Sequence, residues 1–244
     1  MNANSAQSAS SPVQGAVALV TGANRGFGRL FARELLARGA AKVYAAARDP
    51  RTVTDPGVVP VRLDITDPEQ VRAAAVACDD VTLLVNNAGV FRQSPLIGAD
   101  STADAHAEMD TNYFGTLAMT RAFAPVLGRN GGGVLINTLS VLSFVNYAPW
   151  GSYGASKAAL WSLTNATRDE LRAQGTLVVA VHSGLADTDM TAGVEGPDKI
   201  DAKLYVHAAL DAAEQGEIEA LVDGPTRAYK AALAGYPVNA ERAG

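Results

Sequence analysis

The sequence predicts a doubly wound α/β fold, in which a single domain has a mostly parallel sheet with helices on both faces. Short, nearly continuous apolar runs recur along the chain, and segments with helical spacing lie between them. Continuous apolar runs are typical of strands buried on both faces of a parallel sheet. Their alternation with helices is that of βαβ units. The predicted strands are residues 16–21, 42–47, 60–63, 81–85, 134–138 and 177–181.

The predicted helices lie between these strands and carry recognisable end signals. In the first, apolar residues recur at helical spacing over residues 29–37, and Gly39 follows as a stop. The second begins at Pro68, and proline is favoured in the first turn of a helix. The predicted helices are residues 29–37 and 68–77, about 105–128 and 152–173, and finally 226–233.

Length and composition are those of one globular domain. The chain has 244 residues, of which 48% are apolar and 18% are charged, a balance far from that of disordered proteins. Residues 1–14 are mostly Asn, Ser, Ala and Gln and lack the features of a secretory signal, so we expect a flexible tail. Because no repeat or linker interrupts the rest, we expect one domain over residues 15–244.

Charge and residue usage exclude several classes of protein. A net charge of −5 argues against a nucleic-acid partner, because phosphate backbones select basic surfaces. No apolar stretch approaches the ~20 residues of a membrane span, so no membrane partner is expected. A single cysteine, Cys78, cannot form an intramolecular disulfide and fits the reducing cytoplasm. The three histidines lack the spacing of metal ligands, so no metal is expected.

A glycine-rich turn, TGANRGFG over residues 21–28, follows the first predicted strand and precedes a helix. Gly22 can take a tight turn, Gly26 leaves room for a pyrophosphate, and Gly28 lets the helix pack close to the strand. The helix N-terminus adds unpaired N–H groups for phosphate. The alternative is an ordinary strand-to-helix turn. The predicted cofactor contacts of this loop are Gly22, Asn24, Arg25, Gly26, Phe27 and Gly28.

Tyr153 and Lys157 are four residues apart in a predicted helix, which places both side chains on one face. The lysine ammonium is expected to lower the pKa of the tyrosine, so that the phenol can exchange a proton with a reacting oxygen. Ser140 follows the fifth predicted strand, where a hydroxyl can donate a hydrogen bond to a substrate carbonyl. Each residue alone would be an ordinary surface or turn residue, and the prediction depends on their occurring together.

These motifs together resemble the short-chain dehydrogenase/reductase family in its compact form. The glycine loop has the family's spacing, the sequence NNAG over residues 86–89 matches the motif after the fourth strand, and the resemblance covers about residues 15–190. It implies a Rossmann-type domain that transfers hydride reversibly between a nicotinamide and a ketone, an aldehyde or a secondary alcohol. In that chemistry Tyr153 is the general acid/base.

The resemblance assigns further residues to the site. Asn112 matches the fourth catalytic position, where it holds a water molecule that links the lysine to solvent. Lys157 matches the residue that binds the nicotinamide ribose, and Thr188 the one that reaches the carboxamide. Gly184 lies in the turn that holds the nicotinamide, where Ser183 replaces the family's proline. The remaining predicted cofactor contacts are Asp64, at the adenine ring, with Ile65, Asn87, Ala88, Gly89 and Tyr153.

The predicted cofactor is NADP(H). Sites for NAD commonly place an acidic residue at the end of the second strand, where it binds the ribose 2′-hydroxyl. Ala47 occupies that position, and Arg48 and Arg25 can pair with a 2′-phosphate instead. Asp49 is expected to face away or to cap the next turn. The alternative is that both arginines are solvated surface residues.

The predicted partners are a small carbonyl or alcohol substrate and a second copy of the chain. The segment of about residues 189–203 is rich in glycine, proline and charged residues and resembles the family's variable substrate lid. Because the family's usual Val-Asp-Gly-Gly ending is absent, we expect a homodimer through the helices at 105–128 and 152–173 rather than a tetramer. Candidate pocket-lining residues are Phe91, Arg92, Phe144, Val145, Trp150 and Met190.

The leading prediction is therefore an NADPH-dependent carbonyl reductase or alcohol dehydrogenase. A 3-ketoacyl-carrier reductase is one alternative, although it would benefit from a basic entrance, and Lys199 and Lys203 are interleaved with acidic residues. A catalytically silent dinucleotide-binding regulator is the other. Such a regulator need not keep the catalytic residues, and this chain has all four.

Overall fold

The computed structural model describes residues 12–195 and 198–233, and a parallel sheet lies at its centre. The strands are β1 (Val17–Thr21), β2 (Lys42–Ala47), β3 (Val59–Arg62), β4 (Leu83–Asn86), β5 (Val134–Thr138), β6 (Leu177–His182) and β7 (Glu219–Leu221). Their order is β3-β2-β1-β4-β5-β6-β7, and all neighbouring pairs are parallel. The order reverses between β1 and β4, and ligands of such sheets bind at the carboxyl ends beside this reversal.

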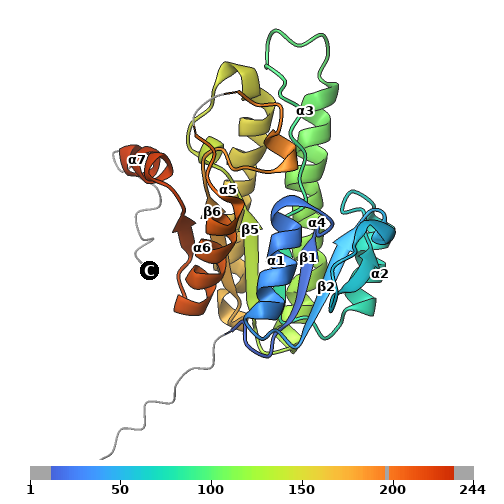
Figure 1. Ribbon diagram of the computed structural model, residues 1–244. Helices are drawn as coiled ribbons and strands as arrows, with labels where there is room; N and C mark the ends of the chain where they lie inside the picture. Colours follow the sequence, from blue (N-terminus) through green and yellow to red (C-terminus); the bar gives the residue numbers. More distant parts are fainter. Residues whose placement is uncertain (1–11, 196–197, 234–244) are drawn as a thin grey trace, which may run out of the picture.

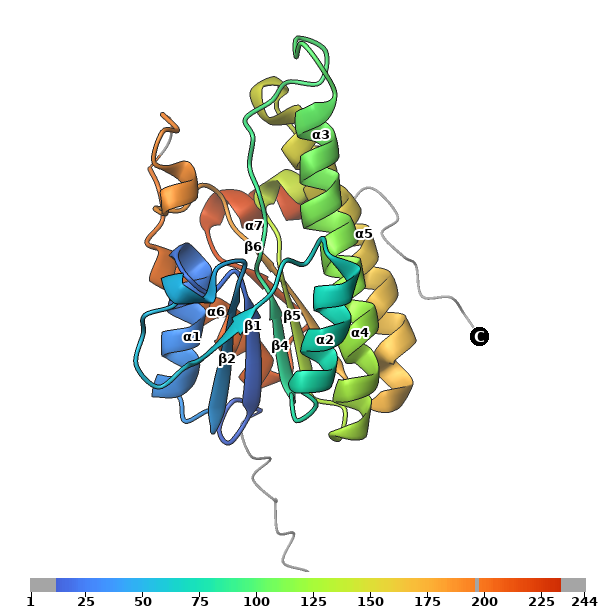
Figure 2. The same cartoon turned by 90° about the vertical axis from the view of Figure 1, so that its right-hand side faces the viewer.

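Helices cover both faces of the sheet, which confirms the predicted doubly wound fold. They are α1 (Gly26–Ala37), α2 (Pro68–Ala77), α3 (Ala103–Glu108), α4 (Thr116–Arg129), α5 (Gly151–Leu171), α6 (Ala202–Gln215) and α7 (Gly224–Ala232). Helices α1 and α6 lie on one face, and α2, α4 and α5 lie on the other (Figures 1 and 2).

The six predicted strands are present, two of them with the predicted ends and four with ends that differ by one or two residues, but α6 and β7 were not predicted. Helix α6 has clear end signals, since the Asp201 carboxylate caps the N–H of Lys203 and Gly216 follows in the left-handed conformation (φ 71°). Its first residues overlap the predicted lid at 189–203. The lid therefore ends where Asp201 starts the helix.

The helix predicted over about 105–128 is interrupted. Between α3 and α4, residues Met109–Gly115 form a π-helical turn, in which hydrogen bonds span five residues instead of four. At Gly115 the turn packs against the loop that follows β3. A Cβ atom at position 115 would lie 2.8 Å from the side chain of Ile65 in that loop. The turn contains Asn112, one of the predicted site residues. Turns of this kind are frequent at functional sites.

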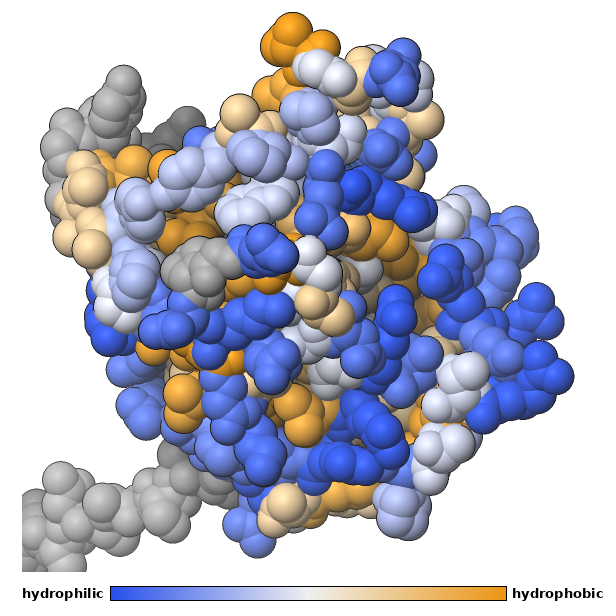
Figure 3. Space-filling model, turned by 45° about the horizontal axis from the view of Figure 1, so that its top comes forward, coloured by the Kyte–Doolittle hydropathy of each residue, from blue (hydrophilic) through white to orange (hydrophobic). Residues whose placement is uncertain are grey.

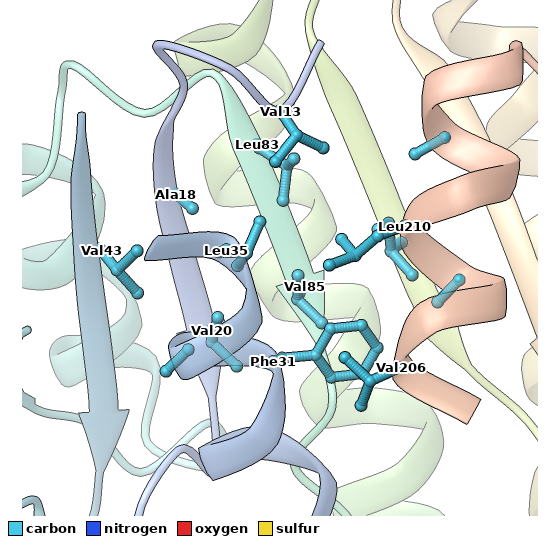
Figure 4. Close-up of a cluster of buried hydrophobic side chains, with 14 of the residues drawn as sticks. Val13, Ala18, Val20, Phe31, Leu35, Val43, Leu83, Val85, Val206 and Leu210 are labelled. Carbon is cyan, nitrogen blue, oxygen red and sulfur yellow. The ribbon is translucent and has the colours of Figure 1, made fainter. Parts of the chain in front are cut away.

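Two apolar layers hold the helices to the sheet. On the α1/α6 face, Phe31 and Leu35 pack with Val206 and Leu210 against β1 and β4 (Figure 4). Burying each such side chain contributes roughly 1.5–3 kcal/mol. The other face has an equivalent layer, built from Leu19, Leu84, Met119, Phe123, Leu127 and Leu135 among others. These layers fix the strand ends that carry the site.

Val13, which lies within the segment predicted to be a flexible tail, is fully buried in the first apolar layer. Residues 1–11 of that segment lie outside the described residues. Within the described part of the chain, no helix combines the length and the apolar character that crossing a membrane requires.

Candidate active site

A cleft of about 510 Å³ lies at the carboxyl ends of the strands and is within the usual range for cofactor sites. Most of the predicted cofactor contacts line it, together with the catalytic pair. These residues are Gly22, Asn24, Arg25, Gly26, Phe27, Arg48, Asp64, Ile65, Asn87, Ala88, Gly89, Tyr153, Lys157 and Thr188. Four predicted residues are not among its lining residues: Gly28, Asn112, Ser140 and Gly184.

The glycine loop has the form that a phosphate-binding loop requires. Gly22 and Gly26 have positive φ of 65° and 51°, conformations that side chains rarely adopt. Gly28 does not line the cleft because it serves packing: a Cβ there would lie 2.2 Å from the carbonyl oxygen of Gly22. Arg25 is the N-cap residue of α1, but its side chain accepts no hydrogen bond from the helix. No capping side chain therefore occupies the N–H groups of the first turn, which remain available to a phosphate.

The loop after β4 braces the glycine loop. Asn87 Nδ2 donates to the carbonyl of Thr21 at 2.8 Å, and the Thr21 hydroxyl accepts hydrogen bonds from the N–H groups of Asn87 and Ala88 at 2.9 and 3.0 Å. The NNAG motif therefore fixes the two loops on either side of the strand reversal. We call these two loops the cradle. The hydrogen bonds between them hold the backbone of both loops in place, as the binding of a dinucleotide pyrophosphate requires.

The far end of the cleft is basic. Arg25 and Arg48 are exposed and line it, next to buried Ala47. Asp49 caps the following turn by accepting the N–H of Arg51 at 3.1 Å, and its carboxylate pairs with the Arg51 guanidinium. This confirms the expectation that Asp49 caps the next turn. Asp49 also lines the cleft, but its carboxylate pairs with Arg51 and with neither of the two cleft arginines in the contacts described for it.

Lys157 lies one turn after Tyr153 in α5, and the two side chains meet in the cleft as predicted. The Lys157 Nζ donates to the carbonyl of Thr138 at 2.8 Å and lies 5.6 Å from the centre of the Tyr153 ring. Burial lowers the pKa of Lys157 to about 8, because the interior disfavours the ammonium. Its charge thus points at the end of β5 rather than directly at the phenol.

The expected lowering of the Tyr153 pKa is wrong for this structure. Burial raises the pKa of Tyr153 above its ordinary value, and the nearby negative charge of Glu108 raises it further. The ammonium of Lys157, which is directed to the carbonyl of Thr138, does not outweigh these two effects. The phenol is therefore held in its protonated form, which is the form that donates a proton.

Ser140 follows β5 and is the N-cap of a short turn over Val141–Ser143. Its Oγ accepts the N–H of Leu142 at 3.1 Å, which leaves the hydroxyl proton free to be donated. The carbonyl of Ser140 accepts a hydrogen bond from Nδ1 of His182 at 3.1 Å. The residue is thus anchored on two sides at the end of β5, behind the residues that line the cleft, and neither contact uses its hydroxyl proton.

Asn112 is fully buried and its side chain ties three segments together. It exchanges two hydrogen bonds with the backbone of Val90, at 2.8 and 3.0 Å, and donates to Ser156 Oγ at 2.9 Å. Both amide N–H groups are therefore occupied, and the side chain positions the NNAG loop against α5. The predicted contact with a water molecule stays a prediction.

The turn after β6 is held by an acidic residue from the end of β7. Asp223 accepts the N–H of Gly184 at 2.7 Å and also caps α7 through the N–H of Thr226. This contact fixes the turn in which Ser183 stands in place of proline. Gly184 itself supports the cleft from behind, whereas Thr188 lines it.

One backbone bridge and one side-chain contact hold the two ends of the lid together. Ala186 and Ile200 form a parallel bridge, and Lys199 Nζ donates to the carbonyl of Thr191 at 2.6 Å. Met190, on this lid, lines the cleft as predicted. Residues 196–197 of the lid lie outside the described residues.

The other predicted pocket residues separate into two groups. Phe91 packs against Tyr153, with ring centres 4.8 Å apart, and Trp150 packs against Phe91, although neither ring is among the residues that line the cleft. Phe144 instead stacks on His182, at 4.3 Å, and lies under Lys230. Its assignment to the substrate pocket is therefore corrected: it belongs to the packing between α5, β6 and α7.

Glu108 is the residue that sequence reasoning missed. It is fully buried, accepts the N–H of Arg92 at 2.7 Å, and accepts the hydroxyl proton of Ser152 at 2.5 Å. A glutamate in a helical segment gives no sign of this, because its partners lie 16 and 44 residues away. Among the residues that the structure describes, no cluster of His, Cys, Asp and Glu side chains could hold a metal.

Comparison with known proteins agrees with the fold and the cleft. The family model for short chain dehydrogenases matches residues 16–198. A short chain dehydrogenase of Burkholderia cenocepacia, solved in complex with NADP, is 44% identical and superposes with a TM-score of 0.88. The superposition covers 92% of this chain and 94% of that protein.

Two curated relatives extend the comparison. A 3-oxoacyl-(acyl-carrier-protein) reductase of Vibrio cholerae is 30% identical over 89% of this chain and 93% of its own. A short chain dehydrogenase of Aspergillus terreus is 32% identical over 75% of this chain, which spans only 44% of that relative. The fold and cleft define a nucleotide-binding α/β protein. The chain belongs to the short-chain dehydrogenase family of oxidoreductases.

Proposed function

We propose that the protein transfers hydride reversibly between NADP(H) and a ketone, an aldehyde or a secondary alcohol. The observation that carries the proposal is the shared cleft: Tyr153 and Lys157 line the same cavity as the glycine loop. The nicotinamide would supply or accept the hydride, and the protein would supply orientation and charge. The proposed activity is that of a carbonyl reductase or alcohol dehydrogenase that acts on small molecules.

Tyr153 acts as the proton donor in the reducing direction. Its raised pKa keeps the phenol protonated at neutral pH, so the proton is present when the substrate oxygen gains negative charge. Ser140 donates a hydrogen bond to the same oxygen with the proton that its own contacts leave free. Lys157 places a positive charge behind the tyrosine, which stabilises the phenolate left after the transfer.

The basic end of the cleft supports NADPH as the cofactor. Arg25 and Arg48 line it, and Asp49 is paired with Arg51, so the acidic group does not oppose a 2′-phosphate. The 44% identical protein from Burkholderia cenocepacia was solved with NADP. Charge-assisted hydrogen bonds from two guanidinium groups favour the phosphorylated cofactor.

A 3-ketoacyl-carrier reductase is the second candidate, because the Vibrio cholerae relative with that activity covers 93% of its length in the match. The same site would reduce a 3-oxoacyl thioester, so the catalytic residues do not separate the two functions. A catalytically silent regulator is disfavoured by the cleft, since it unites the tyrosine and lysine with the glycine loop.

We further propose that the enzyme works in the cytoplasm as a homodimer through α4 and α5. These helices lie side by side on one face of the sheet, and Phe114, just before α4, is 54% exposed (Figure 2). Sedimentation at micromolar concentration tests the dimer. A monomeric wild-type protein would contradict it.

One assay tests the function. Purified protein is mixed with NADPH or NADH and with ketones, aldehydes or a 3-oxoacyl-carrier thioester, and absorbance of the reduced nicotinamide is followed. We expect turnover of small carbonyl compounds with NADPH. Turnover of the carrier thioester alone would favour the second candidate. Binding of NADPH without turnover of either class would favour the regulator.

A further inference from the structure

Aromatic rings lead from the catalytic tyrosine to the surface. The Phe91 ring lies edge-on to Tyr153, with centres 4.8 Å apart, and Trp150 lies 6.2 Å from Phe91. Tyr147 follows at 6.3 Å from Trp150, and its hydroxyl forms a hydrogen bond with that of Tyr229 at the surface. We call Phe91, Trp150 and Tyr147 the aromatic wall. Phe91 and Trp150 are only partly buried, and Tyr147 is exposed, so each has surface left for a ligand.

The inner end of the wall is held in place by a buried carboxylate. Glu108 accepts the N–H of Arg92, the neighbour of Phe91, and the hydroxyl proton of Ser152, the neighbour of Tyr153. The segment that carries Phe91 and the segment that carries Tyr153 are thereby both hydrogen-bonded to the side chain of Glu108. A wall fixed in this way is preorganised to bind a rigid apolar group beside the phenol.

The outer end of the wall is apolar. A second cavity, of about 370 Å³, is lined by Tyr147 and by the loop after β4. On that loop Leu96 is 60% exposed and Ile97 is 96% exposed. Figure 3 shows apolar surface at the protruding end of the molecule, where Figure 1 places the loop between β4 and α3. Tyr147 belongs to the wall and also lines this cavity, so the two meet at its ring, and we call them together the apolar path.

The polar groups along this path are already used. Asn146 is the one side-chain amide among the residues that line the second cavity. Its Nδ2 donates to the carbonyl of Gly151 at 2.9 Å, and its Oδ1 accepts the N–H of Tyr147 at 2.9 Å. No charged residue lines that cavity. A polyol or a charged carrier would leave its own hydroxyl or phosphate groups without partners here, which disfavours it.

We propose that the aromatic wall binds the apolar body of the substrate, so that the enzyme selects ketones and secondary alcohols with an aromatic or alicyclic group over polyols and sugars. This inference rests on the proposed hydride transfer at Tyr153. The carbonyl lies at the phenol, and the ring of the substrate packs on Phe91 and Trp150. Aromatic pairs at such distances add attraction beyond the buried area.

The first test compares methyl ketones that differ only in their tail: butan-2-one, 4-hydroxybutan-2-one and 4-phenylbutan-2-one, each with NADPH. The reacting carbon is nearly the same in all three, so differences in kcat/KM report the tail. We expect 4-phenylbutan-2-one to exceed the other two by roughly tenfold to a hundredfold, the range that an apolar pocket gives. A ratio near one, or a preference for the hydroxylated ketone, would overturn the proposal.

Two variants locate the effect. Trp150→Ala removes a wall residue that contacts Phe91, and it should cut the preference for the phenyl ketone over butan-2-one at least fivefold. Val76→Ala, an exposed apolar residue on α2 outside the wall, is the control and should keep the preference. An unchanged preference in Trp150→Ala would count against the wall.

A binding measurement separates this inference from the proposed function. The chain has two tryptophans, so Trp161→Phe leaves Trp150 as the sole reporter. In the NADPH complex, 4-phenylbutan-2-one should change its fluorescence with saturation, and 4-hydroxybutan-2-one should not. Saturable binding without reduction of any ketone would support the wall and refute the hydride transfer. Reduction without selectivity or saturable binding would refute the wall alone.

Discussion

The carboxylate of Glu108 lies 2.5 Å from the hydroxyl oxygen of Ser152, which immediately precedes Tyr153 in α5. Glu108 is fully buried and no cation pairs with it among the contacts described for it. A buried carboxylate is costly unless hydrogen bonds satisfy it, and here the second oxygen accepts the N–H of Arg92. Its charge raises the pKa of Tyr153, after burial itself.

Glu108→Gln should therefore shift the pH dependence of reduction. The amide keeps the size and an acceptor for Arg92 but removes the charge, so the pKa of Tyr153 falls toward its ordinary value. The protonated donor is then lost at lower pH, and the alkaline limb of the kcat/KM profile moves to lower pH. Activity at neutral pH should fall less than about tenfold, since general acid catalysis by Tyr153 is preserved.

Glu170→Gln is the control for this prediction, because Glu170 is exposed on α5, the helix that carries Tyr153. Its pH profile should match that of the wild type. An alkaline limb that stays in place in Glu108→Gln would show that the carboxylate acts only through packing.

The fold was largely predictable because its signals are local. Apolar runs marked β1, β2 and β5 to within a residue, since a strand buried on both faces leaves few polar positions. Helix α6 was missed although Asp201 and Gly216 mark its ends, because the preceding segment resembled a lid that was expected to continue. The π-helical turn at Met109–Gly115 could not be predicted, because packing against Ile65 decides it.

The site was predictable as a set of positions but not in its electrostatics. The motifs identified Tyr153 and Lys157 and the loop that faces them. Whether the phenol is more or less acidic depends on burial and on Glu108, which is 44 residues from its hydrogen-bond partner Ser152. A local pattern carries no information about such a contact. Phe144 was misplaced for the same reason, since its partner His182 comes from β6.

Tyr153→Phe should abolish most of the catalysis and spare cofactor binding. The variant removes the proton donor and leaves a ring of the same shape against Phe91. We expect kcat to fall by about 10² to 10⁴, the usual contribution of a positioned acid or base. Stopped-flow or steady-state assays measure kcat, and fluorescence titration measures NADPH affinity.

Tyr44→Phe is the matched control, because its hydroxyl lies at the other end of the sheet, beside Asp80 and Lys42. It should leave kcat within about twofold, as surface changes usually have small effects. Near-full turnover by Tyr153→Phe would refute the proposed proton donor.

Gly28→Ala should disrupt the glycine loop. The new Cβ would lie 2.2 Å from the carbonyl oxygen of Gly22 and 2.5 Å from Asn87 Nδ2. Neither atom can easily move, because the first belongs to the backbone and the second donates a hydrogen bond to the carbonyl of Thr21. Overpacking of this kind costs about 1–3 kcal/mol of stability and displaces the loop. We expect a lower Tm and at least tenfold weaker NADPH binding. Gly193→Ala, with no atom within 4 Å of its new Cβ, should change neither.

His182 should make the protein less stable as the pH falls below neutral. The ring is fully buried, and burial lowers its pKa to about 3. Between pH 6.5 and 3 the unfolded chain binds a proton at this histidine and the folded chain does not, so unfolding becomes easier as pH falls. No stability is lost through this group above about pH 6.5, and the loss reaches roughly 2 kcal/mol by pH 5.

His182→Gln removes this titration, so the free energy of unfolding should depend less on pH between 6.5 and 4, although the variant is less stable overall. Urea denaturation at several pH values measures both effects. His207→Gln is the control, because His207 is exposed, and it should keep the wild-type slope. Equal slopes for His182→Gln and the wild type would remove His182 as the cause.

The preference between NADPH and NADH should depend on the basic end of the cleft. Arg25 and Arg48 line it together with Asp49, whose carboxylate is paired with Arg51. Hydrogen bonds to charged groups contribute about 1.5–3 kcal/mol each, so the two arginines should favour NADPH by at least tenfold in kcat/KM. Arg48→Ala should lose about tenfold of the NADPH efficiency and leave that with NADH nearly unchanged.

A double substitution that introduces an acidic residue at the end of β2 tests the same site in the opposite direction. Ala47→Asp with Arg48→Ile supplies an acceptor for a 2′-hydroxyl and repels a 2′-phosphate, so the preference should weaken or invert. Arg51→Ala is the informative companion, since it frees the Asp49 carboxylate that Arg51 now holds and should lower NADPH efficiency without touching the cleft arginines. Equal kcat/KM of the unmodified protein with NADPH and NADH would refute the assignment of the arginines, while the proton transfer at Tyr153 would stand.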